Sequence, residues 1–193
     1  MACNNALLGR YKVYVDIGCG ADKTASPYKE MVALISANTD GVTTNGTTTN
    51  GWIYHVTKVS GLGLGEEGTM EVPDWLKKTV QADGKRNIPQ LGLQFKYMSD
   101  RKTFTLMAAM FNQRATIKYD FQIHVTDKAF NSLYYYEYTG CEMLAFNQED
   151  QELGQSKLIY IDTKFTVDDV KLCDTNGTVI VSTSLTKPVG AGL

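Results

Sequence analysis

The 193-residue chain has few of the residues that usually build metal or catalytic centres. It contains only two histidines, His55 and His124, and no two of its four cysteines lie within four positions of each other. Zinc sites usually take their ligands in closely spaced pairs, so this spacing argues against a zinc site. The first residues lack the pattern of a signal peptide, so we expect free thiols in a chain made in a reducing cytoplasm. The four cysteines are Cys3, Cys19, Cys141 and Cys173.

Long apolar runs and an excess of charge of one sign are also missing. No run approaches the roughly 18 apolar residues of a membrane-spanning helix. The formal net charge is −2, from 19 Lys+Arg against 21 Asp+Glu. Such a chain has no bulk attraction for nucleic acid, which argues against a dedicated DNA- or RNA-binding module. Hydrophobic residues at 43% predict one globular domain over residues 1–193, with flexible termini at 1–8 and 186–193.

Apolar and polar residues alternate over most of the chain, which is the pattern of half-buried strands. For residues 28–37 a short helix is the alternative, and residues 69–83 fit a short helix as well as a strand. Gly140 predicts a bend or bulge in a long strand, and Asn176-Gly177 predicts a hairpin turn. The predicted strands cover residues 10–17, 28–37, 52–60, 88–98, 117–126, 133–146, 157–172 and 178–185.

One segment, residues 100–113, has the period of an amphipathic helix. Ser99 or Asp100 is a suitable N-cap, and one apolar stripe follows at positions i, i+3, i+4 and i+7. The predicted fold is therefore mainly β, with two packed antiparallel sheets in a sandwich or barrel and one helix docked on them. The stripe consists of Phe104, Met107, Ala108 and Phe111.

Residues 38–51 are almost entirely Asn, Gly, Thr and Asp, with Val42 as the one large apolar residue. A polar stretch of this length between two predicted strands is typical of a functional loop, and we expect a long hairpin arm that projects from the domain. The arm consists of Asn38, Thr39, Asp40, Gly41, Val42, Thr43, Thr44, Asn45, Gly46, Thr47, Thr48, Thr49, Asn50 and Gly51.

Motifs for catalysis or cofactors are weak. Gly63, Gly65 and Gly68 have the spacing of a dinucleotide-binding loop, but no helix start follows them, so no cofactor is predicted. There is no nucleophile elbow, and the acidic runs match no calcium loop, so neither catalytic nor metal-binding residues are predicted. His124 fits a solvated or interface histidine better than a general base. The tyrosines in 134–138 fit either an interface or an ordinary aromatic strand.

The second half of the chain resembles the tail tube proteins of contractile-tailed bacteriophages, whose fold is related to the tube protein of type VI secretion. The resemblance covers roughly residues 52–173. It lies in the order of the elements and in local sequence: residues 71–97, then a helix, then DFQIHVTDKAF, EYTGCEML and FTVDDVKL. The Thr/Asn-rich tip of the arm and the four cysteines depart from the family pattern.

This resemblance implies a structural virion protein rather than an enzyme. It implies stacked rings, expected to be hexameric, that form an inner tail tube, with the arm stacking one ring on the next. Partners would be copies of the chain and a surrounding sheath protein, with DNA as a transient passenger and no membrane. Six subunits giving four strands each would enclose a barrel about 50 Å across, wide enough for duplex DNA. The alternatives are another virion assembly protein, a β-sandwich that binds a small ligand or carbohydrate, and a hydrolytic enzyme.

Cys3 lies close to the start of the chain, where residues are usually exposed. A virion subunit folds in a reducing cytoplasm and then enters an oxidising medium. Under the tail tube interpretation, an N-terminal arm lying on a neighbouring subunit would bring Cys3 near Cys19 or another subunit's cysteine. An intersubunit disulfide is therefore a hypothesis, with an unpaired thiol as the alternative.

Overall fold

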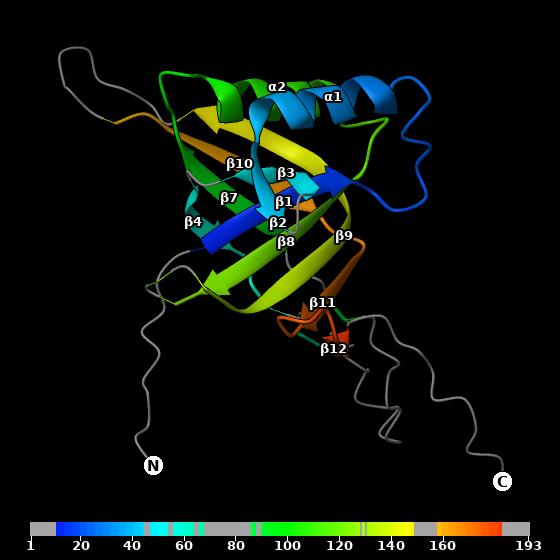
Figure 1. Cartoon of the computed structure of the whole chain (residues 1–193), viewed down its shortest axis with the longest axis vertical. Coiled ribbons are helices and arrows are strands. Elements are labelled where there is room, and N and C mark those ends of the chain that lie inside the picture. Colours follow the sequence, from blue (N-terminus) through cyan, green and yellow to red (C-terminus); the bar gives the residue numbers. More distant parts are fainter. Residues whose placement is uncertain are drawn as a thin grey trace, which may run out of the picture.

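The structure is a computed structural model that describes residues 11–44, 47–53, 56–63, 66–67, 86–87, 90–127, 129, 131–148 and 158–182. These ranges hold two helices, twelve strands and the turns between them (Figure 1). The elements are β1 (Tyr11–Ile17), α1 (Tyr28–Asn38), β2 (Asp40–Thr44), β3 (Thr47–Ile53), β4 (Val56–Ser60), β5 (Glu66–Glu67), β6 (Arg86–Asn87), β7 (Leu91–Lys96), α2 (Lys102–Asn112), β8 (Tyr119–Thr126), β9 (Ser132–Gln148), β10 (Tyr160–Thr166), β11 (Asp169–Cys173) and β12 (Val179–Ser182).

Two antiparallel sheets share strand β9. The first sheet has the order β2-β3-β1-β8-β9-β11-β12, and the second has the order β9-β10-β7-β4. The first part of β9 lies between β8 and β11, whereas its last residues pair with β10. Over the described residues the sheets do not close into a barrel. The prediction of a mainly β fold with two packed antiparallel sheets is therefore confirmed.

Strand β9 passes from one sheet to the other at Gly140, where the sequence predicted a bend or bulge. The pairing with β8 shifts register there, and Gly140 has a φ of +65°, in the left-handed region that favours glycine. The Gly140 N–H donates to Asp120 Oδ1 over 2.9 Å. A Cβ atom at position 140 would lie against the carboxylate of Asp168. Any other residue there would therefore have both an unfavourable backbone conformation and a steric clash.

We expect Gly140→Ala to lower the free energy of unfolding by about 1–2 kcal/mol or more, from its left-handed backbone and the displaced Asp168 side chain. Gly20→Ala is the matched control, because Gly20 also has a positive φ, +91°, but nothing lies within 4 Å of the position of its Cβ. Urea denaturation measures both variants. Equal losses would show that the contact with Asp168 contributes nothing.

The core between the sheets comes from alternate residues of both. Val13 and Val15 of β1 and Leu91 and Phe95 of β7 are fully buried, as the alternation of their segments predicted. The turn at Asn176-Gly177 also forms as predicted: Gly177 has a φ of +85° and joins β11 to β12.

Residues 28–37 form helix α1, so the prediction of a strand was wrong, and the described residues hold two helices instead of one. Residues 69–83, which fitted a short helix as well as a strand, lie outside the described residues. Met31 and Ile35, one helical turn apart, are the buried residues of α1. Asn38 Nδ2 donates to the Leu34 carbonyl, and Thr39 Oγ1 donates to the Ile35 carbonyl. Side-chain donors therefore pair with carbonyl groups of the last helical turn. The spacing of Met31 and Ile35 is that of a helix, whereas the strand prediction relied on the number of apolar and β-branched residues in the segment.

The polar stretch itself forms the strands of the hairpin, so it is not a loop between two flanking strands. β2 and β3 pair within it, with Val42 opposite Thr49 and Thr44 opposite Thr47. Threonine is a strong strand former, and backbone pairing does not need apolar side chains. The single strand predicted for 52–60 is also wrong, because β3 ends at Ile53 and β4 begins at Val56 in the other sheet.

Helix α2 forms where the sequence predicted it, but its N-cap is Arg101, with a φ of +57° and no side-chain cap hydrogen bond, so the predicted N-cap at Ser99 or Asp100 was wrong. The Lys102 N–H still donates to Asp100 Oδ1 over 3.1 Å. Its fully buried residues are Leu106, Met107 and Met110, whereas Phe104, Ala108 and Phe111 of the predicted stripe are only partly buried. The buried face is shifted because α2 packs against both α1 and β9, and the two helices lie side by side over one end of the sheets (Figure 1).

Candidate assembly surfaces

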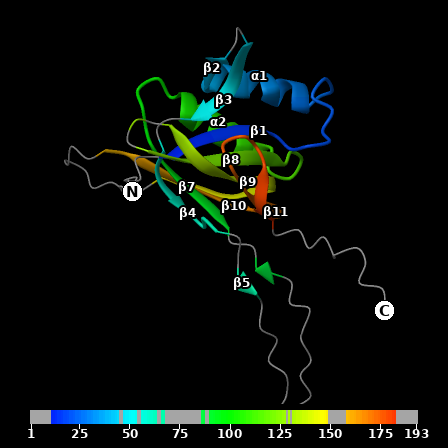
Figure 2. The same cartoon turned by 60° about the horizontal axis from the view of Figure 1, so that its bottom comes forward.

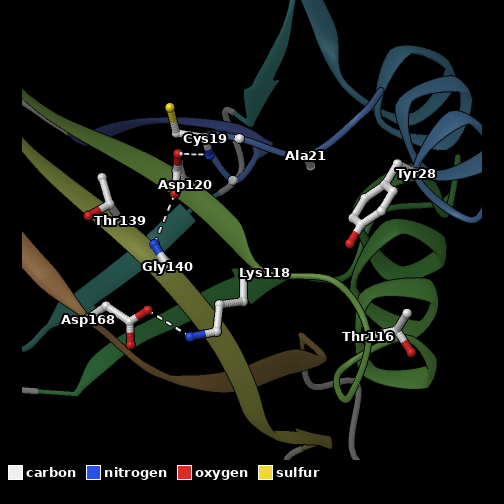
Figure 3. A pocket seen from close by; sticks show the side chains of 11 residues that line it. Cys19, Ala21, Tyr28, Thr116, Lys118, Asp120, Thr139, Gly140 and Asp168 are labelled. Atoms are coloured by element: carbon white, nitrogen blue, oxygen red, sulfur yellow. Dashed lines mark hydrogen bonds and ion pairs between the residues drawn. The ribbon is translucent and has the colours of Figure 1, made fainter. Parts of the chain in front are cut away.

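A hollow of about 570 Å³ in the described surface lies where β9 changes sheet (Figure 3). Its charged groups all have structural partners. Asp120 accepts from the Cys19 N–H and the Gly140 N–H, and Lys118 Nζ lies 2.7 Å from Asp168 Oδ2. The hydrogen bond to Asp168 raises the pKa of Lys118, so this amine stays protonated and is no base at neutral pH. These charged groups therefore hold together the segment after β1, strands β8 and β9, and the turn before β11.

Among the residues that the structure describes, no three His, Cys, Asp or Glu side chains gather closely enough to hold a metal ion. The helices in the same part of the chain are too short or too polar to cross a membrane.

His124 lies in an aromatic strip on the outer face of the first sheet. Its ring stacks on Tyr135 at 4.7 Å with 17° between the planes, and the Trp52 ring lies 5.0 Å away on the other side. Trp52 also contacts Tyr14 at 5.3 Å. His124 Nδ1 lies 3.0 Å from the Ser132 hydroxyl. The strip links the base of the hairpin, through Trp52, to three strands of the sheet, and it places His124 in a packing role.

Burial and the nearby Lys12 lower the pKa of His124 from 6.5 to about 4. Between these values the unfolded chain binds a proton that the folded protein does not, so the free energy of unfolding should fall as the pH is lowered from about 6.5 to 4. Because the ring is partly exposed, we expect a loss of about 1–2 kcal/mol. Denaturation of His124→Gln across this range measures the effect: the variant should lack this part of the pH dependence, and an unchanged profile would assign it to other groups.

The tyrosines of β9 divide between the two faces of the strand. Tyr138 is fully buried and donates its hydroxyl to the Gly61 carbonyl over 3.1 Å. Tyr134 and Tyr136 follow on the same face, with ring centroids 6.0 Å apart, whereas Tyr135 lies on the other face against His124. Tyr138 therefore belongs to the core, Tyr136 is partly buried and packs against the core, and Tyr135 belongs to the outer face of the sheet.

The hairpin of β2 and β3 is anchored at its base on the end of α1. The Gly51 N–H donates to the buried Thr39 hydroxyl over 2.8 Å, and Asn50 Nδ2 donates to Ser36 Oγ over 2.7 Å. Gly51 has a φ of +124°, and a Cβ there would lie 2.6 Å from the Val15 carbonyl oxygen. From this base the two paired strands, which form the end of the first sheet, rise beside α1 and extend away from the other strands (Figure 2). This polar segment is therefore a projecting hairpin that is attached to α1 at its base.

The cysteines divide between the surface and the interior. Cys19 is exposed and carries a free thiol, whereas Cys141 and Cys173 are buried. Cys3 lies outside the described residues, so the intersubunit disulfide stays a prediction.

Strand β12 carries a feature that sequence reasoning missed. Val179, Ile180 and Val181 are 49%, 58% and 40% exposed, although all three are large apolar residues. The available signal was the absence of charge from residues 178–185, which is unusual for an exposed strand at the edge of a sheet.

Comparison with known proteins identifies the fold. No family model matches the chain, and no curated protein matches it by sequence. A chain of the extracellular contractile injection system PVC sheath-tube complex matches with a TM-score of 0.54 and 13% identity, over 89% of this chain and 94% of that one.

Two chains from the anti-feeding prophage are similar as well. One comes from its baseplate, with a TM-score of 0.51 and 9% identity over 90% of this chain and 98% of that one. The other comes from its tube-terminating cap, with a TM-score of 0.51 and 14% identity over 87% of this chain and 91% of that one. The chain therefore has the tail tube fold of contractile injection systems, as its sequence resemblance predicted.

Proposed function

We propose that this protein is a structural subunit that assembles with copies of itself into stacked rings and so forms the inner tube of a phage-like contractile tail. The observation that carries the proposal is the tail tube fold, which extends over nearly nine tenths of the chain. The anchored hairpin of β2 and β3 supports it, because a projecting polar segment suits contact between one ring and the next.

The finer features follow from the same proposal. The rings are hexameric, the hairpin of residues 38–51 stacks them, and a sheath protein surrounds the tube. The sheath is supported by the similarity to a chain of a sheath-tube complex. DNA passes through the tube without lasting contact, which agrees with a net charge of −2, because a basic wall would hold DNA in a salt-dependent way. The subunit is made in the host cytoplasm, resides in the tail of the virion and does no catalysis.

Electron microscopy of the purified full-length protein tests the proposal. We expect rings with sixfold symmetry at low concentration and stacked rings or tubes at high concentration. Analytical ultracentrifugation over the same concentrations gives the number of copies in each species. A monomer at every concentration would contradict the proposal and favour a small β-sandwich that binds a ligand.

A further inference from the structure

His124 lies in the middle of a line of contacts that crosses the first sheet from the hairpin to β11. Its ring is 5.0 Å from the Trp52 ring of β3 on one side and stacks on Tyr135 of β9 on the other. The Tyr135 hydroxyl is hydrogen-bonded to the Cys173 thiol at the end of β11. Of these four side chains, the imidazole is the one that gains a charge in mildly acidic solution, so a change of pH acts on this line through His124.

The surroundings of this ring favour its neutral form. Burial withdraws the imidazole from water, and Lys12, its cross-strand neighbour on β1, adds a positive charge, so the pKa of His124 falls to about 4. The carboxylates on the adjoining strands have other partners. Asp127, just after β8, accepts from Asn131, and Glu137 of β9 lies 3.6 Å from a lysine of β11.

The other titratable groups on this face do not offset a positive charge on the ring either. Burial raises the pKa of Tyr14 on β1 and raises that of Tyr135 to about 12, so both hydroxyls stay neutral in acid. Asp16, further along β1, lies 2.7 Å from Lys23. Among the described residues, a protonated His124 therefore depends on water, which reaches the ring when a covering side chain moves away.

Trp52 is the covering side chain that the sheet holds least. Tyr135 lies on β9, in the middle of the sheet between β8 and β11. Within the described residues, β3 pairs with β1 at its last two residues, Trp52 and Ile53. The hydrogen bond from the Gly51 N–H to Thr39 attaches the hairpin to the end of α1 and does not involve the aromatic strip. Trp52 can therefore leave the imidazole while the hairpin stays attached to α1.

We infer that His124 is a pH-sensitive contact: the neutral ring holds Trp52, and with it the base of the hairpin, on the first sheet, and protonation of the ring releases Trp52 while the domain stays folded. With Trp52 released, the hydrated ring has its ordinary pKa of 6.5, whereas with Trp52 in place the pKa is about 4, so acid favours release over this range. Because the ring is partly exposed, we expect the equilibrium constant for release to rise about tenfold between these two pH values. The inference does not depend on the formation of rings.

Hydrogen exchange of the dilute full-length protein tests the inference. The amides of β3 are compared with those of β7 and β10 in the second sheet, at about pH 7 and about pH 4, after correction for the intrinsic exchange rate. His124→Gln removes the titrating group and keeps a side chain that can hydrogen-bond to Ser132. Lys12→Met removes the neighbouring positive charge and keeps the imidazole. NMR titration of the histidine signals, one of which His124→Gln removes, gives the pKa of His124.

The inference predicts that acid raises the opening of the β3 amides about tenfold relative to those of β7 and β10, and that His124→Gln abolishes this rise. Lys12→Met should raise the pKa of His124 and make the rise smaller, and this result decides the question even if His124→Gln does not fold. An equal rise in all three strands would show that acid acts on the whole domain and would overturn the inference, as would a rise that persists in His124→Gln. A pKa of His124 at or above 6.5 would show that the aromatic rings stabilise the imidazolium, and would overturn it as well.

Discussion

Phe121→Ala should lower the free energy of unfolding by about 3–5 kcal/mol, a large part of the 5–15 kcal/mol that is typical of a whole domain. Phe121 is fully buried on β8, in the first sheet. Its ring meets that of Phe165 on β10, in the second sheet, edge to face with centroids 4.8 Å apart. Removing the ring leaves a cavity between the sheets and ends a favourable aromatic contact. Urea denaturation with refolding measures the loss.

Phe111→Ala is the control for this prediction. The ring of Phe111 is only partly buried, at 6.2 Å from Phe146, with the Arg114 guanidinium 4.3 Å from its centre. Replacing this ring by alanine removes less buried apolar surface than the same change at Phe121, and we expect the free energy of unfolding to fall by about 1–2 kcal/mol. Equal losses for Phe111→Ala and Phe121→Ala would contradict the view that the contact between the sheets dominates stability.

Removing four threonines from the hairpin should abolish ring stacking while the domain stays folded. The deletion of Thr43, Thr44, Thr47 and Thr48 joins Val42 and Thr49, which already face each other, through Asn45-Gly46. Asn-Gly is a favoured two-residue hairpin turn, so the register is kept and the hairpin loses two residues in each strand, about 7 Å of its length. Electron microscopy should show single rings in place of tubes, and sedimentation should show the loss of species larger than one ring.

The anchor at the base makes this deletion selective. The hydrogen bond from Asn50 to Ser36 and that from Gly51 to Thr39 lie outside the deleted residues, so the thermal midpoint should change little. Thr48→Ser, which keeps the length and the hydroxyl, is the control and should stack normally. Tubes of normal length from the shortened chain would show that residues 38–51 do not stack the rings.

Several elements were predictable because local pattern and tertiary structure agree on them. The strand at residues 88–98 has alternate buried residues, and Leu91, Leu93 and Phe95 are indeed in the core. The turn at Asn176-Gly177 and the bend at Gly140 depend on glycine conformations that few other residues adopt, so they too can be inferred locally. Residues 28–37 were not predicted correctly, because a short apolar run fits both periods and its environment decides between them.

The sequence by itself determined the mainly β class, the helix near residue 100, the polar composition of the hairpin and the resemblance to tail tube proteins, because these depend on residue type and on periods of a few residues. Only the tertiary structure decided that β9 serves two sheets, that Asp120 holds Cys19 and Gly140 together, and that three consecutive apolar residues of β12 are exposed. These features join residues as far apart as Cys19 and Asp120, 101 positions along the chain. Such distant pairings are set by how the sheets pack, and no local pattern in one sequence records them.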